Sequence, residues 1–66
     1  MLVFVNGVAR DLAATATVLR LIADLAAPSR GVAVAVNGEV VPRSDWPGAA
    51  LRAGDRVEVL TAAQGG

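Results

Sequence analysis

The stretch that decides the fold is Val32-Ala33-Val34-Ala35-Val36-Asn37-Gly38-Glu39-Val40-Val41-Pro42. Asn-Gly between apolar runs is the strongest short-range signal of a β-hairpin, because both turn residues take positive φ. We therefore predict strands over residues 32–36 and 39–41. Pro42 ends the second strand, since proline has no backbone N–H to donate to a sheet.

The start of the chain repeats this hairpin signal. Leu2-Val3-Phe4-Val5 is rich in β-branched and aromatic residues, and Asn6-Gly7 follows it. Strands are therefore predicted over residues 2–5 and 8–11. A fifth strand is predicted over residues 56–60, after a turn in which Gly54 takes positive φ.

One helix is predicted between the two hairpins, over residues 17–27. Thr17 is a good N-cap, because its hydroxyl can accept from a free amide of the first turn. Pro28 disfavours helical geometry at Ala27, so the helix is expected to end there or one residue earlier. A helix this short must pack on a sheet to be stable. One apolar face has the helical spacing i, i+3, i+4, i+7, and it consists of Val18, Leu21, Ile22 and Leu25.

The order hairpin, helix, hairpin, strand predicts an α+β fold of the β-grasp type, in a single domain over residues 1–66. In this architecture the helix crosses one face of a mixed sheet of about five strands, and the last strand enters between the first strand and another. Residues 43–50 are expected to form a loop that carries the only tryptophan, Trp46. Residues 61–66 are expected to form a flexible C-terminal tail.

Strand alternation divides the apolar side chains between the two faces of the sheet. Because Glu58 should point to water, Val3, Val5, Val57 and Val59 are assigned to the core under the helix. The open face then receives Leu2, Phe4 and Leu60. An apolar group on an exposed face indicates a partner surface; the alternative is that loop residues such as Trp46 cover it.

Composition excludes several classes of function. The 66 residues include no His, Cys, Lys or Tyr, so the usual nucleophile and base pairs cannot be assembled, and we expect neither an enzyme nor a metal site. Six arginines balance six acidic residues without a basic stripe, which argues against nucleic acid as a partner. No stretch could span a bilayer and no signal-peptide pattern opens the chain, so we expect a cytoplasmic protein with no membrane partner.

The chain ends on Thr61-Ala62-Ala63-Gln64-Gly65-Gly66, which is uncharged and small. A packed strand that runs directly into such a tail suits a C-terminal carboxylate that must reach into another protein. Gly65 and Gly66 have no Cβ, so a partner can approach their backbone closely. The alternative is an ordinary frayed chain end.

Three segments together resemble the sulfur carrier family of the thiamine pathway, the ThiS proteins, which have a ubiquitin-like β-grasp fold. The most specific segment is residues 35–46, Ala-Val-Asn-Gly-Glu-Val-Val-Pro-Arg-Ser-Asp-Trp. Residues 51–57, Leu-Arg-Ala-Gly-Asp-Arg-Val, and the terminal Gly65-Gly66 complete the resemblance. It covers essentially the whole chain.

The resemblance implies a carrier protein that is a co-substrate of partner enzymes and binds no cofactor itself. An E1-like adenylyltransferase would use ATP and Mg²⁺ to convert the Gly66 carboxylate to an acyl-adenylate. Sulfur from a persulfide, such as that of a cysteine desulfurase, would replace AMP and leave a thiocarboxylate for thiazole synthase. The tail that enters the partner active sites would be Ala62, Ala63, Gln64 and Gly65, while the folded face supplies most of the affinity.

Three other functions are compatible with the same fold. A molybdopterin-synthase small-subunit-like sulfur carrier would share both fold and tail. A ubiquitin-like protein modifier would form an isopeptide bond to a lysine of its target. A non-covalent β-grasp binding domain would work without Gly66.

Overall fold

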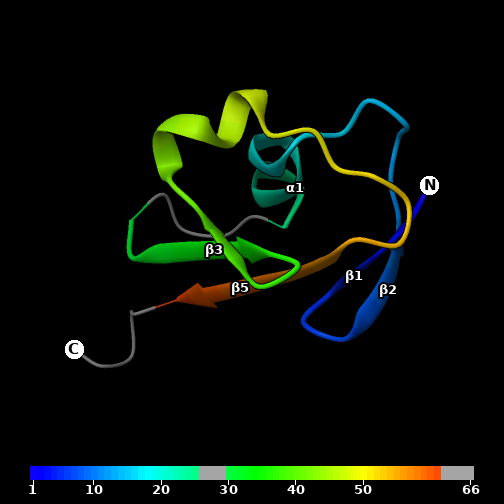
Figure 1. Cartoon of the computed structure of the whole chain (residues 1–66), viewed down its shortest axis with the longest axis horizontal. Helices are drawn as coiled ribbons and strands as arrows, with labels where there is room; N and C mark the ends of the chain where they lie inside the picture. The colour runs from blue at the N-terminus through cyan, green and yellow to red at the C-terminus, as the bar shows by residue number, and fades with distance from the viewer. Residues whose placement is uncertain (26–29, 62–66) are drawn as a thin grey trace.

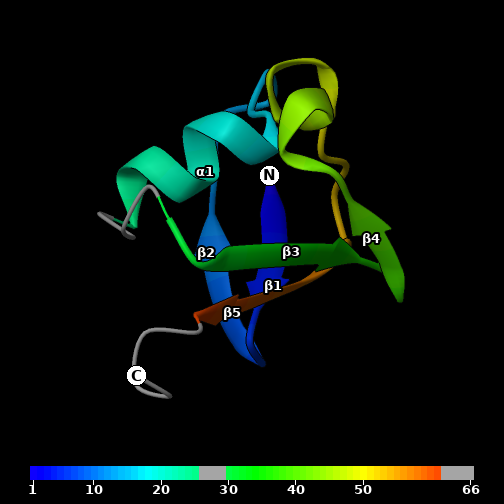
Figure 2. The same cartoon turned by 90° about the vertical axis from the view of Figure 1, so that its left-hand side faces the viewer.

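The structure, a computed structural model, describes residues 1–25 and 30–61. Within these residues five strands form one sheet in the order β2-β1-β5-β3-β4, and one helix crosses a face of that sheet (Figure 1). A short 3₁₀ helix, η1, lies on the same side of the sheet as α1 (Figure 2). The elements are β1 Leu2–Val5, β2 Val8–Asp11, α1 Val18–Asp24, β3 Val32–Val36, β4 Glu39–Val41, η1 Arg43–Gly48 and β5 Arg56–Thr61.

The last strand occupies the centre of the sheet. β5 runs parallel to β1, with Val57 beside Val5, and antiparallel to β3, with Val57 beside Val36. The predicted insertion of the final strand between the first strand and another is therefore confirmed. β5 extends one residue beyond the predicted end, because Thr61 still pairs with Val32 of β3. The bounds of the other four strands agree with the prediction.

The helix begins as predicted and ends earlier. The Thr17 side chain accepts a hydrogen bond of 3.3 Å from the backbone amide of Arg20. α1 ends at Asp24, and Leu25 caps it with a ψ of −6°, far from the helical value of about −42°. The expected continuation through Leu25 is therefore wrong, and residues 26 and 27 of the predicted range lie outside the described residues.

Residues 43–48 form a 3₁₀ helix rather than the predicted loop. The backbone amide of Asp45 donates to the Pro42 carbonyl at 2.8 Å, which closes the first turn. Burial of Trp46 explains why the segment turns inward: its side chain is 3% exposed, and its indole N–H donates to the Val41 carbonyl at 3.0 Å. The Arg43 guanidinium lies 4.9 Å from the centre of the indole ring.

The core lies between the sheet and α1, as the alternation predicts. Val3, Val5 and Val57 are buried, and the half-buried Val59 packs against them. Burial of one valine or leucine side chain contributes about 1.5–3 kcal/mol to folding. α1 contributes the matching apolar face, with Val18, Leu21 and Ile22 buried. Trp46 of η1 and Leu51, in the segment that follows η1, close the core.

Candidate functional site: the open sheet face and the end of β5

The face of the sheet opposite α1 exposes the three predicted partner residues. Leu2 is 49% exposed, Phe4 37% and Leu60 68%. Trp46 lies in the core on the other side of the sheet, so it does not cover this face. The assignment of these three side chains to the open face is therefore confirmed. Their role in binding a partner stays a prediction.

The open face carries two apolar patches rather than one. Phe4 pairs with Arg56 of β5, whereas Leu60 lies four residues further along that strand, or about 13 Å away. Arg56 itself and Glu58, which lies between Arg56 and Leu60, are both exposed. We call the first group the β1 patch, which consists of Leu2, Phe4 and the neighbouring Ala9.

The second group, the tail-end patch, includes a residue that sequence reasoning missed. Val40 is 76% exposed and pairs with Ala35, which pairs in turn with Glu58 on β5. Ala33, two residues before Ala35, pairs with Leu60. The signal for Val40 was available, because its neighbour Val41 faces the core and successive strand residues alternate. The tail-end patch therefore consists of Ala33, Ala35, Val40 and Leu60.

β5 leads from the centre of the sheet to the predicted reactive terminus. It runs away from the N-terminus toward the opposite end of the molecule (Figure 1). Its last residue, Thr61, is exposed and lies beside a shallow hollow of about 350 Å³. Gly31, Val32, Ala33 and Leu60 line the rest of that hollow. The predicted site residues of the tail, Ala62, Ala63, Gln64, Gly65 and Gly66, lie outside the described residues.

Both Asn-Gly turns have the predicted backbone geometry. Asn6 and Asn37 have φ values of 50° and 52°, and the glycines that follow them have φ values of 83° and 86°. Sequence reasoning treated both asparagines as turn residues alone. The structure shows that each also binds β5 through its side chain. Because these partners are 53 and 19 residues away, no local pattern could indicate them.

The turn before β5 is built around Asp55. One carboxylate oxygen accepts from the Arg52 amide at 2.8 Å, and the other accepts from the Asn37 side chain at 3.0 Å. Gly54 has the predicted positive φ, at 86°. These contacts fix the start of β5, so the acidic residue here supports the fold.

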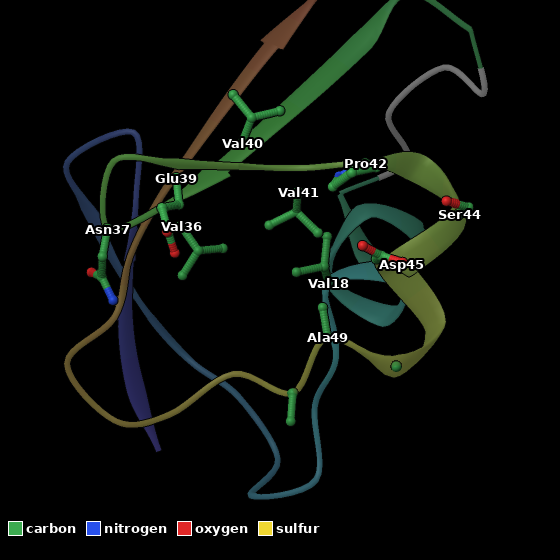
Figure 3. A pocket seen from close by; sticks show the side chains of 12 residues that line it. Val18, Val36, Asn37, Glu39, Val40, Val41, Pro42, Ser44, Asp45 and Ala49 are labelled. Atoms are coloured by element: carbon green, nitrogen blue, oxygen red, sulfur yellow. The ribbon is translucent and has the colours of Figure 1, made fainter.

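A separate cleft of about 630 Å³ lies between β4, η1 and the residues that follow η1. Val18, Val41 and Ala49 face it, and Glu39 and Asp45 border it (Figure 3). It opens on the side of the sheet covered by α1, so it is not part of the predicted partner face.

The described part of the chain holds no cluster of three His, Cys, Asp or Glu side chains arranged for a metal ion. Within the same residues, no helix has the length and apolar character needed to cross a membrane.

A family model and a solved structure both place the chain in one family. The model of the ThiS family matches residues 3–66. The structure matches the crystal structure of the thiamine biosynthesis protein ThiS from Geobacter metallireducens with a TM-score of 0.85 and 33% identity, over 100% of both chains. The thiazole synthase of Paramagnetospirillum magneticum is 38% identical over all 66 residues of this chain, which span 20% of that protein's length.

The mixed sheet, the single crossing helix and the central last strand define a ubiquitin-like β-grasp protein. The chain belongs to the ThiS family, the sulfur carriers of thiamine biosynthesis. The resemblance inferred from the sequence is confirmed.

Proposed function

We propose that the chain carries sulfur as a thiocarboxylate on Gly66 and delivers it to the thiazole precursor of thiamine. A carboxylate is a poor electrophile, so it must first be activated. The Gly66 carboxylate attacks the α-phosphate of ATP, pyrophosphate leaves, and an acyl-adenylate forms. A persulfide sulfur then displaces AMP, and a thiol reductant cleaves the resulting S–S bond to leave the thiocarboxylate.

The proposal rests on the match of the ThiS family model, which extends through Gly66. The residues that lead to Gly66 follow β5, the central strand of the sheet. A rigid central strand gives the terminus a fixed starting point. Gly65 and Gly66 lack side chains, so a narrow active site can enclose them. In-line attack on the α-phosphate allows little freedom, which favours a thin, extended chain end.

The chemistry is assigned to partner enzymes, because the chain has no His, Cys, Lys or Tyr to supply a base or nucleophile. An E1-like adenylyltransferase holds ATP and Mg²⁺, and a cysteine desulfurase persulfide supplies the sulfur. The chain itself is a co-substrate and binds no cofactor. We place all of these steps in the cytoplasm.

Thiazole synthase is the proposed acceptor. The relative from Paramagnetospirillum magneticum bears that name, and this chain matches 20% of its length. That protein contains a segment similar to this carrier chain, which supports a direct transfer of sulfur from the carrier to thiazole synthase. The β1 patch and the tail-end patch are the proposed docking surfaces, since both present apolar side chains beside β5.

The proposal is tested by mass spectrometry of the purified chain. The chain is incubated with an E1-like activating enzyme, ATP, Mg²⁺ and a sulfide source, with reactions lacking ATP as controls. We expect replacement of one oxygen by sulfur, located at Gly66 by fragmentation, because oxidation of Met1 adds nearly the same mass. A chain that stays unmodified beside a known carrier that is modified would support the non-covalent binding domain instead.

A further inference from the structure

The two hairpin turns hold β5 at opposite ends. Asn37, in the β3–β4 turn, accepts from the Arg56 amide at 2.9 Å and donates to the Asp55 carboxylate at 3.0 Å. Asn6, in the β1–β2 turn, accepts from the Val59 amide at 2.9 Å and donates to the Val59 carbonyl at 3.1 Å. One asparagine therefore holds the start of the strand, and the other holds the part next to the chain's terminus.

The Asn6 side chain extends the sheet beyond the end of β1. The last paired residue of β1 is Val5, which lies beside Val57, and Asn6 binds Val59 two residues further along β5. A side-chain amide has one donor and one acceptor group side by side, as a backbone peptide does. The positive φ of Asn6, 50°, is a conformation that asparagine tolerates better than most residues. The turn geometry thus allows a side chain to take the place of a missing strand residue.

We propose that Asn6 is a positioning residue for the carrier reaction. By binding both backbone groups of Val59, it holds the edge of β5 that β1 no longer reaches, near the end of the strand that leads to the predicted tail. Ordering a flexible backbone on binding opposes association. The other edge of β5 pairs with β3 as far as Thr61, so the Asn6 contact completes the restraint of this part of the strand before the partner is met. This inference rests on the proposed function of Gly66.

Asn37 provides a matched control within the same chain. Its turn has nearly the same φ values, 52° and 86°, as the Asn6 turn, 50° and 83°. Glycine accepts a positive φ, so Asn6→Gly and Asn37→Gly keep the turns while removing the side chains. Both variants make the unfolded chain more flexible by one glycine, so this effect is the same in the two. They differ in which end of β5 loses its hydrogen bonds to an asparagine side chain.

Hydrogen exchange of the free protein tests the contact without any enzyme. In Asn6→Gly we expect the Val59 amide to exchange at least about tenfold faster relative to the core amides, because Asn6 is the acceptor for its N–H. In Asn37→Gly the Arg56 amide loses protection and the Val59 amide keeps it. Equal protection of Val59 in both variants would overturn the inference.

Steady-state kinetics with the activating enzyme test the consequence. For Asn6→Gly we expect KM for the carrier to rise about three- to tenfold, while kcat changes less than about twofold, since the edge of β5 that Asn6 no longer holds must be ordered on binding. For Asn37→Gly we expect less than about a twofold rise in KM. Equal increases for the two variants would show a structural role alone and would contradict the positioning role.

Asn6→Asp is a second variant that keeps the size and the acceptor of the native side chain. Its second oxygen faces the Val59 carbonyl, so it loses the donor bond. We expect a KM at or above that of Asn6→Gly, because the charged oxygen also repels the Val59 carbonyl, and a KM equal to that of the native chain would count against the inference. A native chain that is never modified at Gly66 would refute the proposed function, whereas the exchange experiment judges the Asn6 contact independently.

Discussion

The two faces of the sheet differ sharply in the exposure of their apolar side chains. Under α1, Val3, Val34 and Val57 are at most 1% exposed, whereas on the open face Leu60 is 68% and Val40 76% exposed. Val57 and Leu60 belong to the same strand, β5, and point to opposite faces because successive strand residues alternate. The covered face therefore stabilises the fold, and the open face is available for partners. Stability and partner binding should respond to different substitutions.

The largest expected effect is on the covered face. Leu21 is 1% exposed, and Leu21→Ala removes buried methyl groups from the centre of the core. We expect a loss of about 2–5 kcal/mol in the free energy of unfolding, which would leave a domain of this size largely unfolded. Urea unfolding followed by Trp46 fluorescence measures this. A loss below about 1 kcal/mol would contradict the packing described.

The second prediction concerns the open face. Phe4→Ala should weaken binding to the activating enzyme or to thiazole synthase by about tenfold or more, since a central aromatic side chain often dominates an interface. We expect its free energy of unfolding to fall by about 1–2 kcal/mol, less than for Leu21→Ala, because Phe4 is already 37% exposed. Isothermal titration calorimetry and urea unfolding separate the two effects.

Val8→Ala is the matched control for Phe4→Ala. Val8 is 60% exposed but pairs with Val5, so it lies on the face that α1 covers. Its substitution should leave the dissociation constants unchanged. Equal weakening by both variants would show that exposed apolar area, rather than the open face, drives binding.

A smaller effect is expected for Trp46→Phe. The ring remains in the core, but the N–H bond to the Val41 carbonyl is lost. We expect the free energy of unfolding to fall by about 0.5–1.5 kcal/mol, the net contribution of one hydrogen bond, and binding to either enzyme to stay unchanged. Circular dichroism during urea unfolding measures the loss of stability. Weakened binding at unchanged stability would place Trp46 at a partner interface.

The smallest effect is expected on the outer surface of α1. Arg20 and Asp24 form an i,i+4 ion pair at 3.3 Å, with side chains 73% and 50% exposed. Arg20→Ala should lower the free energy of unfolding by less than about 0.5 kcal/mol and leave partner binding unchanged. Thermal unfolding at low and high salt checks this. A loss above about 1 kcal/mol would mean that this surface contributes more than its exposure suggests.

The strands could be predicted because their signals are local. Asn-Gly turns and alternating valines lie within a few residues of the elements they define, and these gave both hairpins and the two faces. η1 could not be predicted in this way, because it depends on the packing of one side chain. η1 forms around a tryptophan whose indole binds the Val41 carbonyl, which no propensity indicates.

The candidate site was predicted in part for the same reason. Alternation placed Leu2, Phe4 and Leu60 on one face, but it does not give the register between β1 and β5. That register, Phe4 beside Arg56, separates Leu60 from the β1 patch. The bonds of Asn6 to Val59 depend on the same register. Gly66 and the residues before it stay predictions from the sequence and the family.

We propose that sulfur leaves this chain from Gly66 to a partner docked on the open face. The most direct test is to prepare the chain with ³⁴S in its Gly66 thiocarboxylate and to supply it to thiazole synthase with the remaining thiazole precursors. We predict that ³⁴S appears in the thiazole product in step with reversion of Gly66 to a carboxylate, and that Phe4→Ala slows the transfer at low carrier concentration. A thiazole free of ³⁴S while the thiocarboxylate is consumed would contradict this account.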